Sequence, residues 1–143
     1  MPALIAAALR ANATYLEAIL QRQPSSVTVP ARRRIGLVTA NAEAALQRLL
    51  GEGPPANRVQ PLMTLVAYSW RLNASTTAIC AEEPSDPSRL APFVDALRAL
   101  ADTAEAGRSP PLLPRLDVER EPEAAQRMAR QIEVVRSSLA RVL

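Results

Sequence analysis

The fold class is decided most clearly by one stretch of the chain, EPEAAQRMARQIEVVRSSLARV at residues 121–142. Its apolar residues recur at steps of three and four, at Ala125, Met128, Ile132, Val135, Leu139 and Val142. This spacing places all of them on one face of an α-helix and does not fit the strict alternation of a strand. The stretch therefore predicts a helix over residues 122–142 that packs by one apolar face.

Working outward, the same spacing recurs in four earlier segments. It predicts helices over residues 3–21, 30–50, 58–82 and 87–106. Between residues 108 and 120 the sequence contains three prolines and no apolar period, which predicts an irregular crossing over the surface. Short connections between the first four helices favour antiparallel neighbours.

Several residues at the ends of these segments have the chemistry of helix caps. Thr28 stands before the second segment, and Asn57 and Gln60 have capping-box spacing at the start of the third. Asp86 followed by Pro87 fits an N-cap and a first helical residue, and Gly107 follows the fourth segment. These residues sharpen the predicted boundaries.

The composition supports the same fold class. Apolar residues make up 48% of the 143 residues, aromatic residues only 3%, and there are four glycines, so strong helix formers dominate. A chain of this length can bury a continuous core without a disulfide or a metal. We therefore expect residues 1–143 to form a single all-α domain, an antiparallel up-and-down bundle of about five helices.

Candidate catalytic groups are few. The chain has no histidine, no lysine and one cysteine, Cys80, which removes imidazole bases, the usual zinc ligand sets and the P-loop lysine. Cys80 itself is expected to be a small core residue. An enzyme that uses only carboxylates and arginine is disfavoured because no motif supports it. We expect no catalytic residue, no metal site and no cofactor.

The strongest charge feature is the run Arg32-Arg33-Arg34. Near the start of a helix beginning at residue 30, the helix dipole disfavours these cations, which points to a partner. Anionic lipid headgroups, an acidic neighbouring subunit and a carboxylate ligand all fit. The alternative is that the three arginines have no partner and simply lie on a solvent-exposed face of the helix. Nucleic acid is disfavoured because the net charge is only +3 and no aromatic residues are interleaved with the run.

Three asparagines, Asn12, Asn41 and Asn73, fall inside predicted helices. Asn12 lies on the apolar stripe itself, where a buried amide costs stability unless it is hydrogen-bonded. Such residues more often fix helix register than bind a ligand. All three are candidate polar core residues.

The first half of the chain carries a family resemblance. Tyr15-Leu-Glu-Ala-Ile-Leu20, then Ala31-Arg-Arg-Arg34, then Asn41-Ala-Glu-Ala-Ala-Leu-Gln-Arg-Leu-Leu50 together resemble the C-terminal cytosolic region of the fusaric acid resistance, or aromatic acid exporter, family of bacterial inner-membrane proteins. The similar part extends from Tyr15 to about Thr77. The later helices fit but add no distinctive motif.

The resemblance implies a non-catalytic cytosolic domain of an inner-membrane efflux protein, one that serves assembly or gating in the export of aromatic acids or other toxic compounds. Its partner would be a transmembrane region of the same polypeptide, outside these 143 residues, with a homo-oligomer or an anionic membrane surface as further partners. The chain lies, on this view, on the cytoplasmic side of the inner membrane. The sequence shows no signal peptide and no long uninterrupted apolar run, so these residues are expected to be soluble. The alternative function is a sensing or regulatory domain that recognises an aromatic carboxylate through arginine.

Overall fold

A computed structural model describes residues 1–143, and it contains helices and no strands. The elements in chain order are α1 (Pro2–Leu20), α2 (Ser25–Gly51), α3 (Ala56–Glu82), the short 3₁₀ turn η1 (Pro87–Leu90), α4 (Ala91–Ala106) and α5 (Glu123–Val142). The prediction of an all-helical chain with five helices is confirmed.

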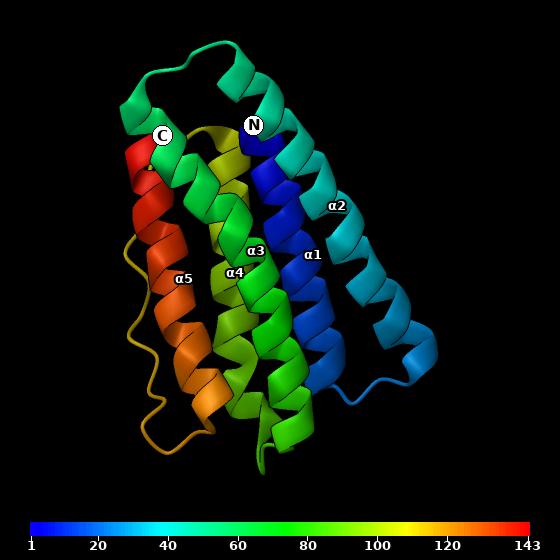
Figure 1. The fold of residues 1–143 in the computed structure, drawn as a ribbon. Helices are drawn as coiled ribbons and strands as arrows, with labels where there is room; N and C mark the ends of the chain where they lie inside the picture. The colour runs from blue at the N-terminus through cyan, green and yellow to red at the C-terminus, as the bar shows by residue number, and fades with distance from the viewer.

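The helices lie side by side along one long axis (Figure 1). From α1 to α4 the chain reverses direction at each connection, whereas α5 runs in the same direction as α4. This is possible because residues 107–122 return along the outside of the bundle without forming a helix or strand, as predicted for the crossing. We call this segment the strap. Pro110 is buried, and Leu113, Leu116 and Val118 pack against the core.

Helix α2 begins five residues earlier than the predicted residue 30. Its N-cap is Pro24, with extended backbone, and Pro30 lies inside the helix. The carbonyl of Pro24 accepts from the amides of Val27 and Thr28, so the assignment of Thr28 as the cap is wrong. A proline this close to a helix start removes only one main-chain hydrogen bond, so Pro30 does not prevent the helix from beginning at Ser25.

Helix α3 repeats this arrangement. Pro55 is its N-cap, no side chain caps the helix, and Pro61 lies within it. The predicted capping box of Asn57 and Gln60 is therefore wrong, because both residues are already inside the helix. In the fourth segment the predicted ends are confirmed: Asp86 accepts from the amide of Ser88 at 3.2 Å, and Gly107 ends α4 in the left-handed conformation.

The core is divided unevenly. A main cluster of 26 buried residues is built from all five helices, with Phe93, Leu97 and Leu100 of α4 completely enclosed. A separate cluster of five residues, Ala8, Ala11, Tyr15, Ile35 and Val38, joins α1 to α2 alone. The first half of α2 is thus attached to the bundle by a small contact.

Helix α1 is long and apolar enough to cross a membrane by length and mean hydropathy, which is 1.3 over its most apolar stretch. The sequence argument did not expect any such segment. More than half of this stretch, 56%, is buried inside the bundle. A core helix of a soluble protein meets the same criteria, so this property does not decide the environment of the chain.

Candidate functional site

All three residues of the arginine run are exposed, and none makes an ion pair or a side-chain hydrogen bond. Because α2 starts at Ser25, Arg32, Arg33 and Arg34 are its eighth to tenth residues. The helix dipole acts mainly within the first turn, so the predicted dipole penalty does not apply to them. Only four of the seventeen arginines make ion pairs, so the run is distinguished by its three consecutive exposed cations.

Residues Ser25–Arg34 form the part of α2 that leans away from the bundle (Figure 1). We call this part the α2 arm. Val27 and Val29 on the arm are each 43% exposed. No acidic residue occurs between Glu17 and Glu43. The arm therefore presents apolar and cationic side chains together, with no internal counter-charge nearby in sequence.

The three asparagines lie in different environments. Asn12 is fully buried and donates from Nδ2 to the carbonyl of Ala8 at 3.0 Å and to Oγ of Ser69 at 3.1 Å. Ser69 is in turn 2.7 Å from the hydroxyl of Thr39, so this buried network joins α1, α2 and α3. Asn12 thus occupies the place expected of a register residue.

The prediction that Asn41 is a polar core residue is wrong, because its side chain is exposed. Its neighbour Ala42 is the one that faces the core, and a step of one residue turns a helix by about 100°. Asn73 is only partly buried, but its Oδ1 is enclosed and has no hydrogen-bond partner. The structure does not bring the three asparagines into one site.

Two other residues of α3, Cys80 and Trp70, are exposed, unlike the buried apolar residues of the same helix. The prediction that Cys80 lies in the core is wrong, because the thiol is exposed at the end of α3. Trp70 is 38% exposed and donates from Nε1 to a carboxylate oxygen of Glu43 at 2.6 Å. Trp70 thereby ties α3 to α2 within the chain.

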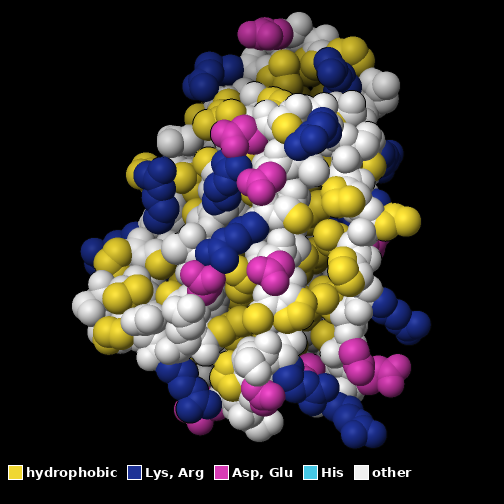
Figure 2. Space-filling model, turned by 180° about the vertical axis from the view of Figure 1, so that it is seen from behind, with side chains coloured by type: hydrophobic (Ala, Val, Ile, Leu, Met, Phe, Trp, Pro, Cys, Tyr) yellow, Lys and Arg dark blue, Asp and Glu magenta, His cyan; other side chains and the backbone are white.

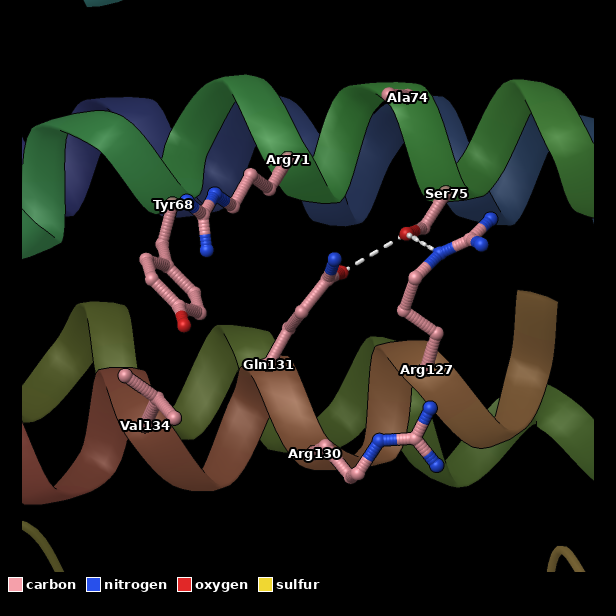
Figure 3. A pocket seen from close by; sticks show the side chains of 8 residues that line it. All are labelled: Tyr68, Arg71, Ala74, Ser75, Arg127, Arg130, Gln131 and Val134. Atoms are coloured by element: carbon pink, nitrogen blue, oxygen red, sulfur yellow. Dashed lines mark hydrogen bonds between the residues drawn. The ribbon is translucent and has the colours of Figure 1, made fainter. Parts of the chain in front are cut away.

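A groove between α3 and α5, which the sequence did not reveal, gathers three further arginines (Figure 3). Arg71 comes from α3, and Arg127 and Arg130 come from α5. None of them makes an ion pair. We call this feature the arginine groove. The spacing of Arg127 and Arg130 on one helix was visible in the sequence, but the packing of α3 against α5 was not.

The floor of the arginine groove is polar and buried. Ser75 of α3 donates to Oε1 of Gln131 of α5 at 2.8 Å (Figure 3). Ser75 is 1% and Gln131 is 8% exposed. Arg127 donates from Nε to the hydroxyl of Ser75 over 3.4 Å, a long bond. The guanidinium of Arg71 lies 4.7 Å from the ring centre of Tyr68.

Four arginines outside the α2 arm and the arginine groove make ion pairs: Arg10, Arg89, Arg98 and Arg136. Arg10 of α1 donates to Asp102 at 2.8 Å and to Glu105 at 2.6 Å, both on α4. Arg98 of α4 donates to both carboxylate oxygens of Glu17, at 2.8 and 3.1 Å. Figure 2, seen from the opposite side to Figure 1, shows basic and acidic side chains next to one another. Hydrogen bonds from Arg98 lower the pKa of Glu17, and those to Asp102 and Glu105 raise the pKa of Arg10.

No group of three or more cysteine, aspartate or glutamate residues is close enough to hold a metal ion. No protein family, curated protein or solved structure matches the chain. The resemblance to the fusaric acid resistance family therefore stays a prediction, and the site must be interpreted from its own chemistry.

Proposed function

We propose that this chain is a non-catalytic helical domain of an inner-membrane efflux protein, and that it rests on the cytoplasmic membrane surface through the α2 arm. The observation that carries the proposal is the set of unpaired arginines on the arm beside exposed valines. Basic residues next to apolar ones are what an interface of anionic lipid headgroups binds. The connection to an efflux protein rests on the resemblance of residues 15–77.

The face of the arm fits a flat surface better than a pocket. Val29, Arg33 and Leu37 follow one another at steps of four, which places them in one row along the helix. All three are exposed, Leu37 by 55%. A row that mixes apolar and cationic side chains allows the valine and leucine to enter the headgroup region while the guanidinium meets phosphate. We also propose an antiparallel up-and-down arrangement for the first four helices, and the row lies on the outside of the domain because its three side chains are exposed.

Vesicle binding tests the proposal. Replacing Arg32, Arg33 and Arg34 with Gln should weaken binding to vesicles rich in phosphatidylglycerol by about 100-fold, because each arginine near such a surface contributes about 1 kcal/mol. Binding of the parent should fall with added salt and be weak on neutral phosphatidylcholine.

The matched control removes the same charge from the strap: Arg108, Arg115 and Arg120, all exposed, are replaced with Gln. An equal loss in this control would show that net charge alone governs binding and would overturn the proposal. A second result would also overturn it: the parent forms a salt-sensitive dimer in sedimentation, and the arm variant loses this dimer but binds vesicles like the parent. A second copy of the chain would then be what covers the arm.

The alternative function, a domain that senses an aromatic carboxylate through arginine, is favoured by one observation, the arginine groove. Three arginines, Arg71, Arg127 and Arg130, line this groove. This alternative expects the ligand to raise the melting temperature of the isolated domain, whereas membrane docking by the α2 arm does not require any soluble ligand.

A further inference from the structure

We propose that the arginine groove is a binding site for the phosphate group of a small phosphomonoester. The site lies on α3 and α5, uses none of the residues of the α2 arm, and does not depend on how the domain meets a membrane. The groove has a volume of about 560 Å³, in the range of small-ligand sites.

The first argument is charge. Arg71, Arg127 and Arg130 line the groove, and no aspartate or glutamate lines it with them. On the opposite side of the bundle Arg10 and Arg98 each lie against carboxylates. Three like charges around one concavity repel one another, and the repulsion is relieved when an anion binds between them. The groove is therefore arranged for a ligand with negative charge.

The second argument is the buried floor. The Ser75 hydroxyl donates to Oε1 of Gln131, which fixes the orientation of the amide and leaves Nε2 of Gln131 without a hydrogen-bond partner in the structure. Nε2 of Gln131 is not enclosed, so it can be reached from the groove and is free to donate to a bound acceptor. An oxygen of a bound phosphate supplies that acceptor, and Arg127 stands on the same side of the floor (Figure 3).

The third argument is preorganisation. The guanidinium of Arg71 lies against the ring of Tyr68, which restricts a side chain that would otherwise move freely. Stacking occupies the face of the guanidinium and leaves its N–H edges free to donate two parallel bonds to an oxyanion. Less rotamer freedom is then lost when the ligand binds.

A phosphomonoester fits this groove better than a carboxylate. It carries nearly two negative charges at neutral pH and three acceptor oxygens, against one charge and two oxygens for a carboxylate. The three arginines that line the groove and the amide of Gln131 offer more donors than a carboxylate can use. The apolar lining consists only of Tyr68, Ala74 and Val134, at the side of an open groove, so little of an aromatic ring would be buried.

Titration with inorganic phosphate, followed by amide NMR shifts at low ionic strength, tests the site. We expect saturable binding with shifts centred on residues 71–75 and 127–134. Single variants Arg71→Gln and Arg127→Gln should each weaken binding about tenfold or more, the effect of losing one charge-assisted hydrogen bond. Binding should be stronger at pH 8 than at pH 5, because phosphate is mainly the dianion at pH 8 and mainly the monoanion at pH 5.

The matched control is Arg141→Gln, which removes an exposed arginine near the end of the same helix, outside the groove. It should bind phosphate like the parent. The variant with Arg32, Arg33 and Arg34 replaced by Gln should also bind phosphate normally, which separates failure of this site from failure of membrane docking. Circular dichroism should show the groove variants folded, since their arginines are exposed.

Three results would overturn the proposal: no saturation up to about 20 mM phosphate, equal weakening in Arg141→Gln, or acetate binding as tightly as phosphate, which would assign the groove to carboxylates. Two sources of the phosphate group are then distinguished. Vesicles containing phosphatidic acid, tested on the α2-arm variant, should be bound through the groove if the source is a lipid. Glycerol phosphate should bind at least as well as inorganic phosphate if the source is soluble.

Discussion

The two sides of α1 differ in what holds them. Toward α4, α1 packs Leu9 and Leu16 against the main core, and the rim of this contact is closed by arginine–carboxylate pairs. Toward the first half of α2, three of its residues join Ile35 and Val38 in a separate cluster of five, beside the polar network around Asn12. The α4 side combines apolar burial with direct ion pairs, whereas on the α2 side Asn12 is linked to Thr39 only through Ser69 of α3.

This difference also separates the arginines. Those beside α1 and α4 serve the fold, because their charges are used by partners within the chain. Those on the α2 arm and in the arginine groove have no such partner. The unpaired arginines of the arm and of the groove are exposed, so a partner can reach them.

The largest effect is expected on the α4 side. Replacing Phe93 with Ala should lower the free energy of unfolding by about 3–5 kcal/mol, because Phe93 is 1% exposed and its removal leaves a cavity in the main core. Urea denaturation measures the change. Leu112→Ala is the control, since Leu112 is 85% exposed on the strap and should change stability by less than about 0.5 kcal/mol. A loss below about 1.5 kcal/mol for Phe93→Ala would mean that the α4 side is not the tighter one.

An intermediate effect is expected on the α2 side. Replacing Asn12 with Ala should lower the free energy of unfolding by about 1–3 kcal/mol, because the buried Ser69 hydroxyl loses the hydrogen bond that Asn12 donates to it. Ser69 then keeps only its hydrogen bond with Thr39. The measurement is again urea denaturation. Asn41→Ala, an exposed position on α2, is the matched control and should be nearly neutral. If Asn12→Ala is as stable as the parent or more so, hydrogen bonding does not hold the α2 side.

The smallest effect concerns the rim between α1 and α4, and it depends on pH. Hydrogen bonds from Arg98 lower the pKa of Glu17 below its ordinary value of 4.5, so the pair adds stability above that pH and loses it as the pH falls through the lowered pKa. Glu17 is 38% exposed, so solvent screening limits the contribution to less than about 1 kcal/mol.

Glu17→Gln should therefore melt slightly below the parent at pH 7 and together with it near pH 3. Asp117→Asn, an exposed acid on the strap without an ion pair, should show no such convergence. A difference between Glu17→Gln and the parent that persists unchanged at pH 3 would contradict the assigned pKa direction.

The sequence predicted the parts of this molecule that depend on neighbours along one helix. The stripe of α5 and the cap at Asp86 are both local, and both were found as predicted. The predicted start of α2 was wrong because Pro30 was taken as the boundary of the helix, whereas the N-cap is Pro24. The arginine groove was out of reach, since Arg71 and Arg127 are 56 positions apart and meet only after α3 packs against α5.

The strap has a consequence for how α5 belongs to the molecule. Because it returns along the whole bundle, α5 is attached by a long tether and held in place by its own buried residues, Met128, Ile132, Val135 and Leu139. The strap is itself held to the bundle, because Pro110 is buried and Leu113 and Leu116 pack against the core, so it also limits where α5 can lie. One side of the arginine groove is therefore formed by α5, and the groove exists only while α5 stays packed against the other four helices.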